Sequence, residues 1–394
     1  WLSCILAVLL PAAGGGYLLR ASAGADNAQQ SVYYGTGNPQ HDLISGCALC
    51  GFSVLVLCVL ICQRRSISMA IEIIDEAAQC LTNMPVLLIE PWMSFFIRLL
   101  VAIPGVIGLL LLNMAGDSVN RVDLTNPQQM YKTDDIVLVC VVYYAVVFLW
   151  IMELLHAISQ FVVIYTAEIW FFKVRPARYF AGSAGFTFYD MLRGYVAGTT
   201  YHLGSLIYGS FLITIFRVIR IFAAIVIRAM DNTGNPVGAC IAQVFLSMVT
   251  CLQWIVEYIS NMSYMDIALN SSTYCAGAKQ ALDIINKQAG VCLFVEGATL
   301  IFTILGVGVI GAATGGVLWL VCGHVDRYSN PESPHYVDDP EKTVTFCAIL
   351  GGLMAVPFMH LFDTIADTIV YCEAVDQSRK SVSSSLGSMF GVFG

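Results

Sequence analysis

The sequence predicts an all-α, polytopic membrane protein with about eight transmembrane helices and one amphipathic helix on the membrane surface. Its composition is 58% hydrophobic and only 12% charged, whereas an ordinary soluble domain is about one-quarter charged. Apolar runs of about 20 residues, the length that crosses a bilayer core, recur along the chain. One further segment has apolar and polar faces with the period of an amphipathic helix.

Residues 1–62 are expected to hold the first two transmembrane helices, Trp1–Leu19 and Ile44–Cys62, joined by an external loop. Residues 63–85 are expected to form a cytoplasmic, interfacial amphipathic helix. In this segment apolar residues from Ile67 to Leu81 recur at helical spacing, polar residues lie opposite them, and Pro85 ends the pattern.

Residues 86–376 are expected to form a transmembrane bundle of about six helices. Residues 377–394 are expected to form a cytoplasmic tail. Arg217, Arg220 and Arg228 interrupt the apolar character in the middle of this bundle. The apolar runs that define its helices are Val86–Leu112, Ile136–Val163, Thr199–Phe216, Val237–Tyr258, Val291–Val321 and Val344–Cys372.

Lysine and arginine in the short loops predict the orientation, because they are enriched on the cytoplasmic side. Arg64 and Arg65 place the segment after the second span in the cytoplasm, and Arg379 and Lys380 place the C-terminus there. The arginine-containing segment 217–228 does not fit this rule, because the alternation of successive spans puts it near the outer face of the membrane. Either its arginines pair with acids or phosphates, or the region does not cross as expected. The other loop residues that agree with this orientation are Lys173, Arg175, Arg178, Arg193, Lys279 and Lys287.

Several function classes are disfavoured by the sequence. The formal net charge of −8 argues against a nucleic-acid partner. No HExxH, GxSxG or phosphate-binding loop is present, so we expect no enzyme and no catalytic residues. Cys47 and Cys50 form a CxxC without the second pair of a zinc site, so we expect no metal and no cofactor. The chain begins at Trp1 inside an apolar run, and we expect it to be a piece of a longer protein.

Ionisable residues inside the spans are the candidates for function, because burying charge in a bilayer is costly. Glu153, His156 and Gln160 fall broadly on one side of a helix together with Trp150. A carboxylate beside an aromatic ring suits an ammonium group through Coulomb attraction and cation–π contact. The alternative is a set of interhelical hydrogen bonds that joins the spans.

Two later spans carry similar groups. Trp254, Glu257 and Tyr258 follow Gln253, and these residues either bind a cation or anchor the helix at the membrane interface. Asp363 and Asp367 share one side of the last span with His360. They are candidates for a proton or ion relay, or they neutralise Arg217 and Arg220 on a neighbouring helix. Glu296 has no obvious partner nearby in the sequence and is positioned to reach the interface.

Several separate segments resemble the choline transporter-like protein family. Arg64–Arg65, Ile71–Ala78 and Met84–Pro85 are similar to that family's basic stop, amphipathic helix and following span. The most specific match is Tyr201–Ser205, followed by Gly209–Ser210 and Arg220. Together the matches cover roughly residues 60 to 376 in the family's order. The remaining ones are Gln160, Trp170–Lys173, Cys251–Leu252, Asn261, Ser263–Tyr264, Ala268–Ala281, Asp367–Ile369, Cys372 and Asp376.

The resemblance implies the choline transporter-like fold, here without that family's first two spans and the large external loop between them. It implies facilitated transport of choline, or a related small organic cation such as ethanolamine, through a membrane whose lipids surround the bundle. Combined with the polar groups described above, it gives a set of candidate substrate-binding residues. They are Glu153, His156, Gln160, Tyr201, His202, Trp254, Glu257 and Tyr258.

Two other functions remain open. Gln253 stands where the family has a glutamate, and Ile164–Thr166 with Glu168 stand where it has small residues. These differences fit a transport-inactive homologue that serves as a structural subunit of a larger membrane assembly. The third reading is a lipid-handling or scrambling protein, which needs a groove open to the bilayer. The plasma membrane and an organelle membrane fit the sequence equally.

Overall fold

The computed structural model describes residues 2–25, 39–62, 64–114, 135–174, 188–232, 236–329, 333–335, 337 and 339–391. Every secondary-structure element assigned in these ranges is a helix. The chain divides into two compact units, Trp1–Glu72 and Ile73–Gly394. Each unit is described by itself below.

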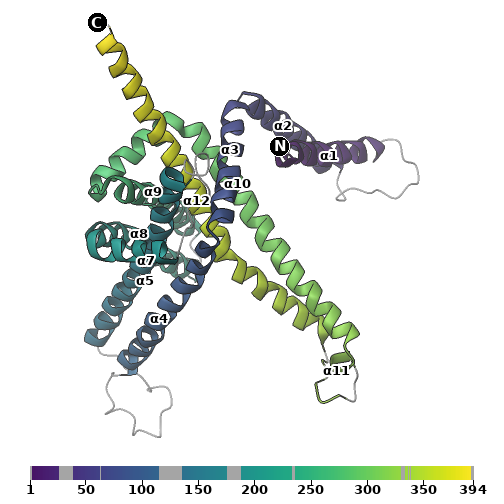
Figure 1. The fold of residues 1–394 in the computed structure, drawn as a ribbon. Coiled ribbons are helices and arrows are strands. Elements are labelled where there is room, and N and C mark those ends of the chain that lie inside the picture. The colour runs from purple at the N-terminus through teal and green to yellow at the C-terminus, as the bar shows by residue number, and fades with distance from the viewer. Residues whose placement is uncertain are drawn as a thin grey trace. The chain divides into compact units, whose positions relative to one another are not determined.

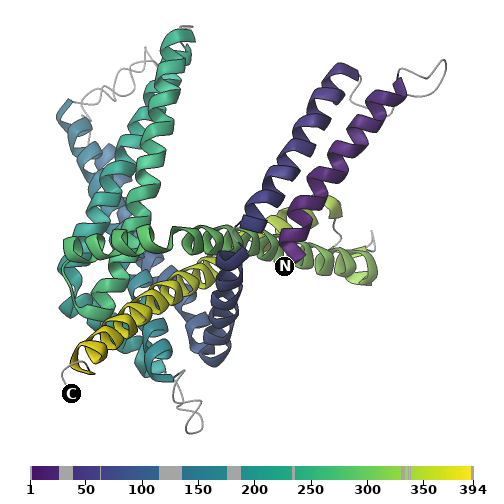
Figure 2. The same ribbon diagram turned by 90° about the horizontal axis from the view of Figure 1, so that it is seen from above.

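The first unit is built on a helical pair, α1 (Leu2–Ala25) and α2 (Pro39–Cys62), which lie side by side (Figure 2). Gly15 and Gly46 let the two backbones approach, because a Cβ atom at Gly15 would lie 2.9 Å from the Gly46 carbonyl oxygen. The Ser53 hydroxyl donates a hydrogen bond of 2.9 Å to the Val8 carbonyl oxygen. Small residues and a polar contact therefore help to join two largely apolar helices.

The predicted amphipathic segment is helical as α3 (Arg64–Asn83). It ends before Pro85, which begins the short 3₁₀ helix η1 (Pro85–Ile89). Ile73, Ala77 and Cys80 recur at helical spacing and are buried. Burial raises the pKa of the Cys80 thiol, as expected for a cysteine that acts as a small apolar side chain. The position of α3 at the membrane surface stays a prediction.

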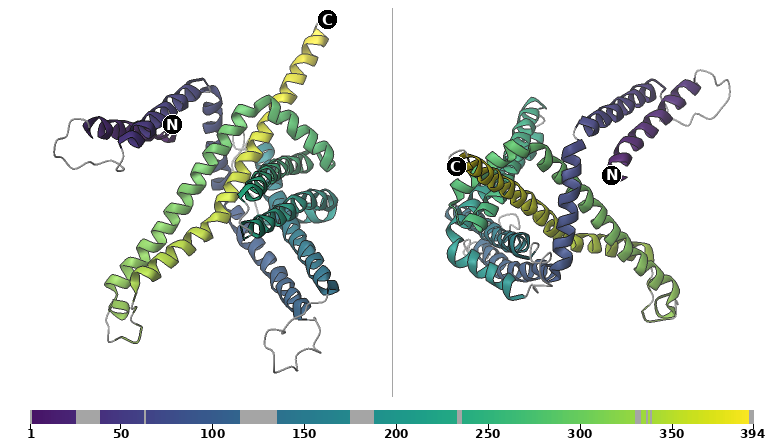
Figure 3. Two further views of the ribbon diagram at one scale, coloured as in Figure 1. Left: turned by 180° about the vertical axis from the view of Figure 1, so that it is seen from behind. Right: turned by 45° about the horizontal axis from the view of Figure 1, so that its top comes forward.

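The second unit contains the longer helices. In Figures 1 and 3, α10 and α12 run side by side before they diverge, and α4 lies beside α5. The α10 segment is kinked at Gln288, whose backbone dihedrals are not helical. The elements are α4 (Glu90–Met114), α5 (Asp135–Ile169), η4 (Trp170–Val174), α7 (Phe188–Val196), η5 (Ala197–Tyr201), α8 (Leu203–Asn232), α9 (Pro236–Asn270), α10 (Tyr274–His324), α11 (Asp326–Ser329) and α12 (Pro340–Gly391).

Seven helices in the described residues are long and apolar enough to cross a membrane. The predicted all-α, polytopic membrane fold is thereby confirmed. The expected span Trp1–Leu19 is helical as α1 but is not among these seven. Arg175 and Arg178, used for the orientation, lie outside the described residues. The seven segments are Leu43–Cys62, Pro85–Met114, Ile136–Lys173, Leu203–Ala229, Cys240–Asn270, Asn286–His324 and Pro340–Lys380.

Several expected boundaries differ from the structure, and two of them bear on the bundle. The run predicted to end at Phe216 continues as α8 through Arg217 and Arg220 to Asn232. The last span continues as one helix, α12, from Pro340 to Gly391, so no helix end separates the bundle from the predicted tail at residue 377. In both cases the helical backbone extends into polar sequence, which hydropathy alone does not follow.

The core of the second unit is formed by large side chains of α5, α9 and α12, including Phe161, Tyr264 and Tyr371. The Tyr371 hydroxyl donates a hydrogen bond of 2.7 Å to Oδ1 of Asp266, and the Asn270 amide donates to the same oxygen across 2.7 Å. The first bond joins α12 to α9 and the second lies within α9, so the core is fixed by polar contacts as well as by packing.

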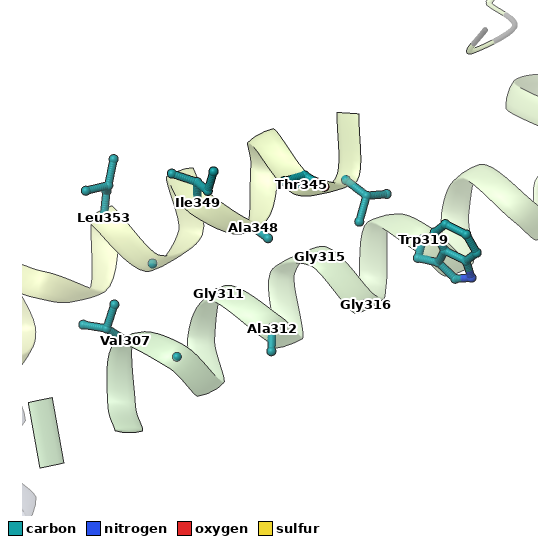
Figure 4. Close-up of a pocket in the computed structure, with 13 residues that line it drawn as sticks. Val307, Gly311, Ala312, Gly315, Gly316, Trp319, Thr345, Ala348, Ile349 and Leu353 are labelled. Atoms are coloured by element: carbon teal, nitrogen blue, oxygen red, sulfur yellow. The ribbon is translucent and has the colours of Figure 1, made fainter. Parts of the chain in front are cut away.

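The α10–α12 hairpin packs through small residues (Figure 4). A Cβ atom at Gly311 would lie 2.9 Å from the Ala348 carbonyl oxygen, and one at Gly315 would lie 3.0 Å from the Ala348 Cβ. The GxxxG motif formed by Gly311 and Gly315 thus lies where two backbones approach closely. Beside it is an open apolar groove of about 710 Å³ between Trp319 and Leu353.

Candidate functional site

A cavity of about 490 Å³ lies within the second unit, and α4, α5, α8, α9, α10 and α12 all contribute side chains to its wall. A volume of this size is typical of small-molecule sites. Of the eight candidate substrate-binding residues and two candidate relay residues, eight line it. They are Glu153, His156, Gln160, Trp254, Glu257, Tyr258, Asp363 and Asp367.

Arg217 of α8 forms an ion pair with Glu153 of α5, and its Nη2 lies 3.4 Å from Oε1 of Glu257 on α9. The Glu153 side chain is only 5% exposed, whereas Glu257 is 34% exposed. Of the two alternatives for this arginine, the structure supports pairing with acids inside the bundle. A buried carboxylate is tolerated when a cation compensates it, and Arg217 supplies that cation.

Residues of one turn of α9 surround Glu257. Nε2 of Gln253 donates a hydrogen bond of 2.7 Å to Oε1 of Glu257. The rings of Trp254 and Tyr258 are stacked with their centroids 5.8 Å apart. This part of the wall therefore presents a carboxylate next to two aromatic faces, the combination that attracts an organic ammonium.

A second polar network joins α4 to α5 and α7. Nη2 of Arg98 lies 3.1 Å from Nδ1 of His156. Glu90 accepts hydrogen bonds from the Ser159 hydroxyl, at 2.6 Å, and from the Tyr195 hydroxyl, at 3.1 Å. Burial, and secondarily the nearby Glu90 charge, raise the pKa of Tyr195, so this phenol stays protonated and donates.

The sequence reasoning missed Glu90 and Arg98. Both line the cavity and lie inside the apolar run Val86–Leu112. A signal was available, because they are eight residues apart, about two helical turns, and so share one face. The free-energy cost of placing an ionisable side chain in the bilayer, which identified Glu153 as a candidate, applies equally to these two residues.

The third part of the wall is acidic. Glu296 of α10 and Asp363 and Asp367 of α12 line the cavity. In the described part of the chain no arginine or lysine forms an ion pair with any of the three. Asp367 is 8% exposed. Arg217 pairs with the two glutamates instead, so the aspartates are not its ion-pair partners.

Tyr201 and His202 do not line the cavity. Tyr201 is 80% exposed. The His202 ring lies against Phe161, with centroids 5.5 Å apart, where burial lowers the pKa of the imidazole. The two residues form the junction between η5 and α8, and the His202 amide donates to the Ala197 carbonyl oxygen across 3.2 Å. The two residues therefore belong to the connection between α7 and α8 and not to the cavity wall.

The sequence profile of the family described as plasma-membrane choline transporter matches residues 47–378, which is most of the chain. The chain belongs to this choline transporter family. Choline transporter-like protein 1 of Xenopus laevis is 22% identical over 384 residues, which cover 95% of this chain and 56% of that protein. Choline transporter-like protein 3 of Bos taurus is 25% identical over 338 residues, covering 84% and 48%. The chain thus spans about half the length of these curated relatives.

Membership of the choline transporter family confirms the resemblance seen in the sequence. It supports an integral, multi-pass membrane protein with a transporter-like role. The matched region, 47–378, contains every residue of the cavity wall named above.

Proposed function

We propose that this protein carries out facilitated transport of choline or a related small organic amine, and that the cavity holds the ammonium head during passage. The observation that carries the proposal is the charge of the cavity wall. Its lining residues include six carboxylates but only two arginines. Such an excess of acidic over basic side chains favours a cationic ligand. The carboxylates are Glu90, Glu153, Glu257, Glu296, Asp363 and Asp367.

The ammonium head is assigned to the acids of α10 and α12 rather than to Glu153 and Glu257, which already hold Arg217. Tyr258 lines the same cavity as Glu296 and Asp367 and supplies an aromatic face. Movement of the surrounding helices would then expose the cavity to one side of the membrane and then to the other.

The open bundle centre favours transport over the structural-subunit reading, which expects a solidly packed centre. Ile164, which by the resemblance stands where the family has a small residue, lines the cavity without filling it. The groove of the α10–α12 hairpin is apolar and offers no polar path for a lipid headgroup, so scrambling has less support.

The test is uptake of radiolabelled choline and ethanolamine by purified protein in liposomes, with an ion-gradient control. We expect saturable uptake that choline analogues compete away. The double variant Asp363→Asn/Asp367→Asn is expected to lose at least about tenfold in apparent affinity, equivalent to about 1.4 kcal/mol. The exposed acid Glu341 provides the control variant, Glu341→Gln, which should transport normally. Absence of saturable uptake by folded protein would overturn the proposal.

A further inference from the structure

We propose that Glu153 and Glu257 form a second cation subsite, which the protein's own Arg217 occupies, and that this resident cation restricts the cavity to ligands with one positive charge. The inference deepens the proposed function and rests on it for the first subsite, at Glu296, Asp363 and Asp367. It makes Arg217 a residue that determines specificity between monoamines and diamines.

The way Arg217 is held shows that the acid pair recognises charge more than guanidinium shape. A guanidinium has five N–H donors in a fixed fork, and a dedicated site satisfies most of them. Here Nη1 contacts Glu153 and Nη2 lies 3.4 Å from Glu257. Nε is buried and has no hydrogen-bond partner among the described residues. A smaller cation would therefore lose little by replacing it.

Gln253 orients one of the two acids, although it is not itself among the residues that line the cavity. Its side chain is almost fully buried, and Nε2 donates to Oε1 of Glu257, which orients that carboxylate. Its Oε1 is buried without a hydrogen-bond partner in the described residues. A primary ammonium has three donors. The two carboxylates line the cavity and offer four acceptor oxygens from α5 and α9.

The two subsites share one cavity. Tyr258 follows Glu257 directly in the sequence, and both line the same wall as Asp367 and Glu296. A ligand with an ammonium at each end is thus able to contact the acids of both subsites at once. In the wild type the guanidinium of Arg217 repels the second ammonium, because like charges in a poorly solvated cavity are weakly screened.

The test measures binding of α,ω-diammonium alkanes of increasing spacer length, and of choline, by isothermal calorimetry with purified full-chain protein. Arg217→Gln is expected to raise the affinity for the best diammonium ligand at least about tenfold more than it raises the affinity for choline. Glu153→Gln/Arg217→Gln is the safer variant for folding, because it removes both charges of the buried pair. It leaves Glu257 free and should retain part of the gain.

The matched control is Glu153→Gln/Arg217→Gln/Glu257→Gln, which lacks both the resident cation and the acid pair and should bind diammonium ligands as weakly as the wild type. The second subsite is wrong if the single and double variants show no gain, or if the triple variant shows the same gain. Choline binding by the wild type separates this result from the proposed function. If the wild type does not bind choline, the first subsite is wrong. The comparison of diammonium binding among the Arg217 variants tests only the second subsite.

Discussion

Arg98 of α4 donates a hydrogen bond to Nδ1 of His156 in α5, across 3.1 Å. A guanidinium has no acceptor, so Nδ1 must accept and the ring proton must be on Nε2. Two helices that are far apart in the sequence thus fix the tautomer of a histidine in the cavity wall. His335 shows the opposite arrangement, because Arg327 contacts its Nε2 at 2.8 Å.

We therefore predict that His156 is neutral with its proton on Nε2. Nitrogen NMR of histidine-labelled protein measures this directly, and His156→Ala identifies the signal. Arg98→Gln should release Nδ1 and give a mixture of tautomers. A wild-type signal with the proton on Nδ1, or a doubly protonated ring, would contradict the assignment.

Glu153→Gln should destabilise the protein more than Glu257→Gln, because the Glu153 carboxylate is far more buried. We expect a loss of about 1–3 kcal/mol in unfolding free energy for Glu153→Gln and less than about 1 kcal/mol for the solvent-screened Glu257 pair. Denaturant unfolding in detergent micelles provides the comparison. Equal losses for the two variants would show that burial does not determine the strength of these pairs.

Gly209→Ala is expected to destabilise the core, while Gly204→Ala in the same helix is its matched control. A Cβ atom at Gly209 would lie 2.8 Å from Cε2 of Tyr274 and would also contact Tyr264, whereas nothing lies within 4 Å of one at Gly204. Overpacking of this kind costs about 1–3 kcal/mol. Thermal unfolding should show a lower midpoint for Gly209→Ala alone, and similar midpoints would refute the close approach.

Tyr371→Phe tests the bond between α12 and α9. The variant removes a donor from the buried Asp266 carboxylate, at an expected cost of about 1–3 kcal/mol. Tyr143 is 70% exposed, so Tyr143→Phe should leave the unfolding free energy nearly unchanged. The bond makes no net contribution if the two tyrosine variants unfold alike.

Composition and periodicity were sufficient for much of the fold. The apolar runs predicted the membrane helices, and the spacing from Ile67 to Leu81 with Pro85 predicted α3 and its end. The extent of α8 was not predictable from hydropathy. Arg217 looks like a span boundary until its partners are known, and those partners come from helices distant in the sequence.

The same limit applies to the site. A charge inside an apolar run identified Glu153, Glu257, Asp363 and Asp367 as residues that need a partner. Which carboxylates are compensated by Arg217 and which remain open depends on tertiary packing. Tyr201 and His202 were included because of the family motif, and a motif does not say which way a side chain points.

Equilibrium binding of radiolabelled choline to the purified protein tests the central claim most directly, using Asp367→Asn with Glu341→Gln as its control. The account predicts saturable binding by the wild type and the control, with at least about tenfold weaker binding by Asp367→Asn. Unchanged choline affinity in folded Asp367→Asn protein would contradict the assignment of the ammonium site to the acids of α10 and α12.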